Sequence, residues 1–95
     1  MAQLIIPTPL RKFTSGVALF EDNASTVGSL LYALAHAYPG LQPHLFDSTG
    51  TLRHFIRVYV GDEDIEGLQG VETPIEAQTE VSIIPAIAGG TNDKN

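Results

Sequence analysis

The sequence predicts an α+β fold in which one main helix covers a mixed sheet of four to five strands. Two observations support this prediction. Short runs rich in β-branched residues lie near both ends and in the second half of the chain, bounded by Pro, Gly and polar residues. One longer segment repeats apolar residues at spacings of three and four, as an amphipathic helix does. The chain has 95 residues, which is enough for one hydrophobic core and too few for two.

Two strands are expected before the helix. Gln3–Ile6 is short and apolar, and Pro7 and Pro9 end it because proline cannot donate a backbone hydrogen bond. A second strand is expected over Gly16–Asp22. Residues 8–15 between them are few enough to form a hairpin connection.

The helix is expected to follow Ser25 or Thr26, because either side chain can cap its first turn. Pro39 and Gly40 should end it. The apolar stripe is the expected core face. It consists of Val27, Leu30, Leu31, Leu34, Ala35 and Tyr38.

Further strands are expected after the helix. Residues 54–60 alternate in character, so we assign Ile56, Val58 and Val60 to the core and the side chains between them to the opposite face. A short edge strand is expected near Ile65, and the last strand should cover residues 80–86. The residues predicted to face away from the core are Phe55, Arg57 and Tyr59.

The order of these elements predicts a topology. The first and last strands are almost continuously apolar, which suits adjacent central positions in a sheet. If they pair in parallel, the helix and the later strands form the long crossover that such pairing requires. One helix covers one sheet face and leaves the other open. This is the β-grasp, or ubiquitin-like, arrangement.

Composition narrows the classes of function. The net charge is −6, which disfavours nucleic-acid binding and favours a basic face on a protein partner. No apolar run approaches the ~20 residues that span a bilayer, and no secretory signal is evident, so we expect a cytoplasmic protein without a membrane segment. Cys is absent, and the three histidines lack metal-ligand spacing. Without a nucleophile, a metal site or a phosphate loop, we do not expect an enzyme with its own active site, and we expect no bound cofactor.

The C-terminus has an unusual pattern. The last strand runs into Gly89 and Gly90, and five polar residues, "TNDKN", follow. We therefore divide the chain into a domain over residues 1–88 and a flexible tail over 89–95. From Pro85 to Gly90 an extended chain reaches roughly 17 Å, which is enough to enter a narrow channel in another protein. Gly89, Ala88 and Ile87 keep this thread slim.

Three co-linear blocks carry a resemblance to a known family. They are "IPTPLRKFTSG", "AYPGLQPHLFDSTGTLRHFIRVYVGDEDI" and "VSIIPAIAGG". Together they resemble the MoaD/ThiS family of ubiquitin-like sulfur carriers, and within it the carriers associated with cysteine synthases. The resemblance implies that an adenylating, E1-like partner uses ATP to activate the Gly90 carboxylate, which then becomes a thiocarboxylate. It also implies a sulfur-accepting partner, such as a cysteine synthase. The open sheet face should dock these partners through Phe55, Arg57, Tyr59 and Ile84.

The sequence departs from the family pattern at two places. Arg57 replaces an Asn of close relatives, and Gly61-Asp62 replaces Asn-Asp, which could alter the choice of partner. Family members usually stop at the second glycine, whereas Thr91 here joins Gly90 through a peptide bond. We therefore expect an inactive precursor that a zinc metalloprotease of the JAMM type cleaves between Gly90 and Thr91.

Several alternatives remain open at this stage. The chain could be the small subunit of a molybdopterin synthase or a carrier for a thiazole pathway, because these share the thiocarboxylate. It could be a ubiquitin-like modifier joined through Gly90 to lysines. It could also be a plain interaction module that uses only the open sheet face. The sequence does not identify the final sulfur acceptor or the oligomeric state.

Overall fold

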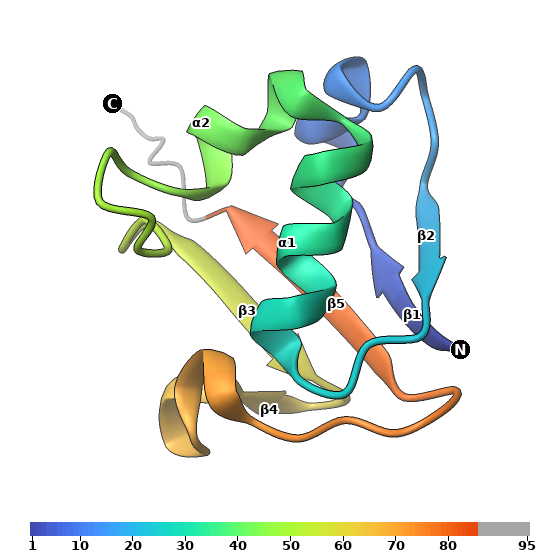
Figure 1. Ribbon diagram of the computed structural model, residues 1–95, viewed down its shortest axis with the longest axis vertical. Coiled ribbons are helices and arrows are strands. Elements are labelled where there is room, and N and C mark those ends of the chain that lie inside the picture. The colour runs from blue at the N-terminus through green and yellow to red at the C-terminus, as the bar shows by residue number, and fades with distance from the viewer. Residues whose placement is uncertain (86–95) are drawn as a thin grey trace.

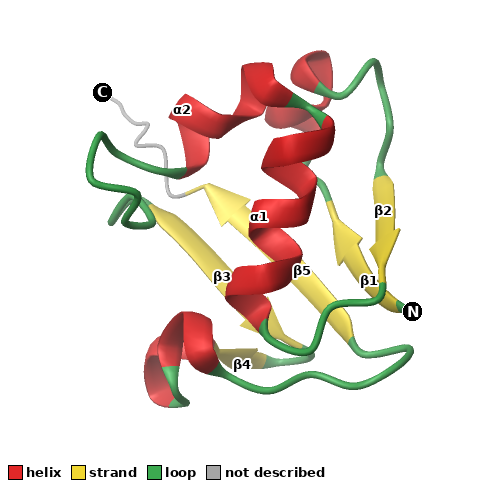
Figure 2. Cartoon of the chain, viewed as in Figure 1, coloured by secondary structure: helices red, strands yellow, loops and turns green. Residues whose placement is uncertain are grey.

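A computed structural model describes residues 1–85, and residues 86–95 lie outside the described part. Five strands form one mixed sheet in the order β2-β1-β5-β3-β4, and the helices lie against one of its faces (Figures 1 and 2). The predicted β-grasp fold is confirmed. The strands are β1 (Ala2–Ile5), β2 (Leu19–Asp22), β3 (Ile56–Val60), β4 (Glu63–Asp64) and β5 (Glu80–Pro85), and the helices are α1 (Val27–Ala37) and α2 (Gln42–Leu45).

The central pair of the sheet is β1 and β5. They run parallel, with Leu4 opposite Val81 and Ile5 opposite Ser82. The predicted adjacency of the first and last strands is confirmed, and α1 lies in the crossover that joins them (Figure 1). β3 pairs with β5 in the antiparallel sense, from Ile56 opposite Pro85 to Val60 opposite Val81.

Helix α1 supplies most of the opposite layer. Thr26 caps it, since its Oγ1 accepts a hydrogen bond from the Ser29 backbone N–H at 3.1 Å. The helix ends at Ala37, and Pro39 begins a 3₁₀ turn that leads into α2. The predicted stripe is buried except for Tyr38, which is partly buried against the core. The buried members are Val27, Leu30, Leu31, Leu34 and Ala35.

The strands alternate as the sequence predicted. Ile56 and Val58 are buried, and Val60 is partly buried against the same core. The registers place a second set of side chains on the face away from α1. This set, which we call the open face, comprises Gln3, Ile5, Leu19, Glu21, Arg57, Tyr59, Ser82 and Ile84.

Two local predictions were wrong in detail. The connection after β1 contains a 3₁₀ turn over Thr8–Phe13, and β2 begins at Leu19 and not at Gly16. The buried Thr14 explains this, because its hydroxyl donates to the Val17 carbonyl at 2.9 Å and folds the chain before the strand starts.

The short edge strand predicted near Ile65 is confirmed, and it ends one residue before Ile65. β4 consists of Glu63 and Asp64, and Ile65 begins a 3₁₀ turn with its side chain in the core. Asp64 ends the strand, since its carboxylate accepts from the Glu66 backbone N–H at 2.9 Å and starts that turn. The predicted loop after α1 likewise contains the short helix α2, where Pro43 presets the backbone of the first turn.

Candidate functional site

The predicted carrier residues lie beyond the end of β5. Gly90, Gly89, Ala88, Ile87 and Thr91 are all outside the described residues, so their roles remain predictions. The last described residue, Pro85, lies opposite Ile56 at the start of β3. The chain beyond Pro85, which contains the tail, therefore begins at the end of a central strand, and the same end of the sheet carries α2 and the loop before β3 (Figure 1).

Three of the four predicted docking residues share the open face. Arg57 lies directly opposite Ile84, and Tyr59 lies opposite Ser82 on the same pair of strands. The Ile84 side chain is 47% exposed, which is high for an isoleucine in a central strand. Phe55 lies apart from these three, in the turn before β3, and it is also exposed.

Two further apolar residues extend this surface. Leu19 on β2 lies opposite Ile5 on β1, and Leu19 is 46% exposed. The sequence alone does not indicate either residue, because the first strand is almost continuously apolar and gives no clue to which side chains face outward. The register of β1 against β2 and β5 supplies that information. Apolar side chains from four strands thus meet on one uncovered surface, as at protein-binding sites.

Charged groups surround the apolar residues of the open face. The Arg57 guanidinium is 3.0 Å from Glu66 Oε1 and 3.5 Å from Asp64 Oδ2. On the same face, Gln3 Nε2 on β1 donates to Glu21 Oε2 on β2 at 3.2 Å. Because the Arg57 pairs are about half exposed, they hold the guanidinium across the strands but contribute little to folding, ~0–1 kcal/mol.

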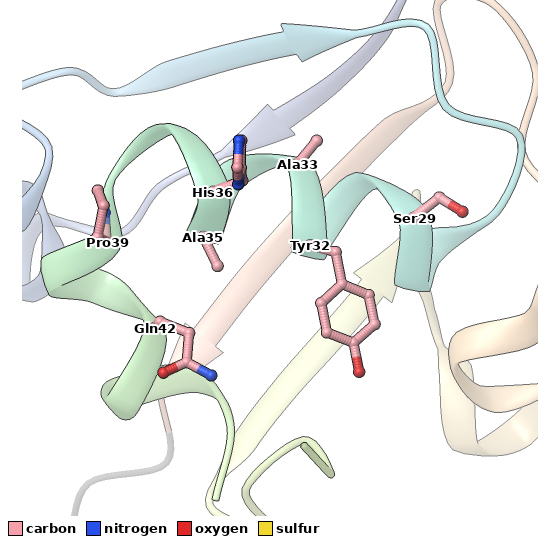
Figure 3. A pocket seen from close by; sticks show the side chains of 7 residues that line it. All are labelled: Ser29, Tyr32, Ala33, Ala35, His36, Pro39 and Gln42. Carbon is pink, nitrogen blue, oxygen red and sulfur yellow. The ribbon is translucent and has the colours of Figure 1, made fainter.

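A groove runs along the outer side of α1 and continues to α2 (Figure 3). Tyr32 lines it and stacks on Phe46 with ring centroids 4.7 Å apart, and its Oη donates to the Gly50 carbonyl at 2.9 Å. His36 is the only other lining residue with a titratable side chain. The groove therefore has no paired acid and base suited to catalysis. The lining residues are Ser29, Tyr32, Ala33, Ala35, His36, Pro39 and Gln42.

The loop before β3 contains one carboxylate with an altered pKa. Thr49 Oγ1 donates to Asp47 Oδ1 at 2.6 Å, and the backbone N–H groups of Thr51 and Thr49 donate to the same oxygen. These hydrogen bonds favour the ionised form and hold the pKa of Asp47 below its usual value. They close a polar turn on the surface, so Asp47 has a structural role.

Residues 1–85 contain neither a cluster of metal ligands nor a helix that could span a membrane. Among residues 1–85, no group of three His, Cys, Asp or Glu side chains is placed to hold a metal ion. The three histidines lie on α1, on α2 and in the turn before β3. Neither helix described here has the length and apolar character needed to cross a bilayer.

Comparison with known proteins identifies a family model, sequence relatives and solved structures that this chain resembles. The ThiS family model matches residues 4–90. The sulfur carrier protein CysO of Mycobacterium tuberculosis is 38% identical over 87 residues, which cover 90% of this chain and 94% of the relative. Small archaeal modifier protein 3 of Haloferax volcanii is 30% identical over 69 residues, covering 73% and 74% of the two chains. In the Amycolatopsis orientalis BexX/CysO complex, a chain with 32% identity superposes with a TM-score of 0.85 and covers 95% of this chain and 100% of that one.

Proposed function

Because the chain belongs to the ThiS family, we propose that it is a sulfur carrier whose thiocarboxylate forms at Gly90. The observation that carries this proposal is the family match through residue 90, which ends on the second of two glycines. Glycine lacks a Cβ, so a Gly-Gly end passes where other residues would not fit. The folded body over residues 1–85 would then serve for recognition and the tail for transfer.

The proposed chemistry has two steps. A carboxylate oxygen of Gly90 attacks the α-phosphorus of ATP, and pyrophosphate leaves, which gives an acyl adenylate. Sulfide or a persulfide sulfur then attacks the acyl carbon, the bond to the AMP oxygen breaks, and a thiocarboxylate remains after any S–S bond has been reduced by a thiol. Both steps take place on the main chain, so the carrier needs no cysteine of its own, and the sequence has none. We propose that the reaction takes place in the cytoplasm, where ATP is available.

The partners follow from this chemistry. An adenylating, E1-like enzyme would bind the open face and take the tail, since Pro85 is at the edge of that face and roughly 17 Å of chain separates it from Gly90. The BexX/CysO complex is a precedent for a relative bound to another protein. Arg57, Tyr59 and Ile84 are the proposed contacts, with Phe55 beside the tail exit.

Activation would require prior cleavage. Thr91 occupies the Gly90 carboxyl group in a peptide bond, so no adenylate can form there in the full chain. We propose that a JAMM-type zinc metalloprotease removes residues 91–95. The mass of the protein isolated from its native cell tests this step, because retention of Thr91 in every molecule would end the precursor proposal.

The proposed destination of the sulfur is cysteine or a related amino acid, since the CysO relative has the highest identity among those described above. The test supplies the chain ending at Gly90 in thiocarboxylate form, with O-acetylserine or O-phosphoserine and the cysteine synthase of the same cell. We expect cysteine to form and the carrier to return to its carboxylate mass. A molybdopterin synthase or thiazole pathway is favoured if the thiocarboxylate persists with both substrates.

A second candidate function is protein modification through the same activated Gly90. The 30% identity to small archaeal modifier protein 3 is the observation that favours it. Higher-mass conjugates that appear on a denaturing gel and vanish on deletion of Gly89 and Gly90 would support this function. If the chain truncated after Ala88 keeps full activity in the cell, both candidates fail and a plain interaction module remains.

A further inference from the structure

Among residues 1–85, most acidic residues lie at one end of the sheet and most basic residues lie at the other. The acidic groups gather at the end opposite the tail exit, around the start of β1 and β5 and the end of β2 and β3. This placement follows from the registers, because Glu21 and Glu80 both lie opposite Gln3, and Glu63 lies opposite Val60. The acidic end comprises Glu21, Asp22, Asp62, Glu63, Asp64, Glu66, Glu72, Glu76 and Glu80.

The basic groups gather at the other end. Arg11 and Lys12 lie in the 3₁₀ turn after β1, His44 lies on α2, and Arg53 and His54 precede β3. Figure 1 shows these segments together at the end of the molecule where β5 terminates. We call these five residues the basic rim. Arg57 is the one other Lys or Arg among residues 1–85, and two carboxylates already neutralise it.

Contacts hold the basic rim together. The Phe13 ring stacks on His44 with centroids 4.1 Å apart, and Lys12 Nζ lies 5.3 Å from the centre of the same ring. Arg53 Nε donates to the Pro43 carbonyl at 2.7 Å, which ties the segment before β3 to α2. The rim is therefore a preformed surface and not a set of independent side chains.

The basic rim borders the point where the tail leaves. Arg53 accepts, through its carbonyl, the backbone N–H of Ile56 at 3.0 Å, and Ile56 lies opposite Pro85. Arg11 Nε donates to the carbonyl of Ile6, just past the strand that runs parallel to β5. Among residues 1–85, Asp47 is the one carboxylate at this end, and Thr49 and Thr51 already donate to its Oδ1.

We propose that the basic rim docks on an acidic protein surface surrounding the channel that receives the tail. This inference rests on the proposed function and adds the charge of the partner's channel mouth, which the family assignment does not give. The protein has a net charge of −6, so the basic rim differs in sign from the molecule as a whole. This difference can orient the carrier as it approaches its partner. An acidic mouth attracts the rim and repels the acidic end, so the carrier approaches with its tail foremost.

The test measures association between the chain ending at Gly90 and the adenylating enzyme of its own cell. That chain keeps every strand of the sheet and the whole described core, because the described structure ends at residue 85. Lys12→Glu changes the rim, and Lys12 is exposed, so the fold should be retained. The matched control, Gln69→Glu with Ala77→Glu, changes the net charge equally but at exposed positions near the acidic end.

We expect Lys12→Glu to slow association about fivefold to tenfold at low ionic strength. The control should differ from the parent by less than about twofold, and the rim effect should vanish near ~1 M salt, where the screening length is only ~3 Å. As a second rim variant, Arg53→Gln should slow association, whereas Arg53→Lys, which keeps the charge, should not. Equal rates for Lys12→Glu and the parent, or equal slowing by the control, would overturn the inference.

Adenylation, followed by pyrophosphate release at saturating enzyme, separates the two proposals. If the parent is adenylated and the rim variants associate as fast as the parent, only the basic rim inference fails. If the parent neither binds nor is adenylated, the carrier proposal and the basic rim inference both fail.

Discussion

Two adjacent isoleucines on β5 provide a direct test of the two-faced sheet. Ile83 points into the core and is 2% exposed, whereas Ile84 points to the open face and is 47% exposed. Both are in the same central strand and both are isoleucine, so replacement by alanine removes the same atoms and changes strand propensity similarly. Any difference between Ile83→Ala and Ile84→Ala therefore reports burial.

The expected magnitudes follow from the exposed fractions. Each substitution removes three carbons, worth about 0.8 kcal/mol apiece when fully buried, or about 2.4 kcal/mol in total. At Ile83 a cavity in the core adds to this, giving a loss of about 3–4 kcal/mol in the free energy of unfolding. At Ile84 roughly half the side chain already contacts water, so the loss should be about 1 kcal/mol. We predict a difference of about 2 kcal/mol between the two variants.

Urea unfolding of the two variants measures this difference. With an m-value of about 1–3 kcal/mol/M, about 2 kcal/mol separates the two midpoints by roughly 0.7–2 M. Ile84→Ala should also bind the adenylating partner more weakly, because it removes an apolar contact of the open face. Equal midpoint shifts, or a larger shift for Ile84→Ala, would refute the assignment of faces on which the docking surface depends.

Three further predictions concern single side chains. Arg57→Asn should lower the unfolding free energy by no more than ~1 kcal/mol, since its ion pairs are half exposed, and thermal melting at low and high salt checks this. Thr26→Ala should destabilise the protein by about 1 kcal/mol in urea unfolding through loss of the α1 cap, whereas Ser25→Ala should change little, and the reverse order would assign the cap to Ser25. NMR titration should place the pKa of Asp47 below its usual value, and Thr49→Val should raise it, because the hydrogen bond from the Thr49 hydroxyl lowers it most. The stability contributed by the Asp47 carboxylate is therefore present above its unfolded pKa and lost as the pH falls through its lower folded value; an unchanged pKa in Thr49→Val would contradict this account.

The parts of the fold that the sequence predicted are those with a strong local period. The apolar spacing in residues 27–38 determines one helical face, and five of its six members are buried. The alternation in β3 likewise separated Ile56 and Val58 from Arg57 and Tyr59. The adjacency of β1 and β5 was predictable because both strands are almost continuously apolar. Such strands are typical of central positions in a sheet, where most of their surface is buried.

Other features depend on contacts between residues distant in the sequence. Nothing in "QLII" indicates that Ile5 faces outward, and only its pairing with Leu19 and Ser82 decides this. The basic rim was also invisible in the sequence, because topology brings Lys12, His44 and Arg53 together from three separate segments. The edge strand ends at Asp64 because the Asp64 side chain caps the following 3₁₀ turn, a contact made within three residues of the sequence.

The central claim is that the Gly90 carboxyl group carries sulfur as a thiocarboxylate. Intact-mass measurement of the chain ending at Gly90, incubated with the adenylating enzyme of its cell, ATP and sulfide, tests it most directly. We predict a mass increase equal to the exchange of one oxygen for one sulfur, and no such increase for the full chain, in which Thr91 occupies that carboxyl group. A trimmed chain that keeps its carboxylate mass, with no pyrophosphate released, would contradict the account.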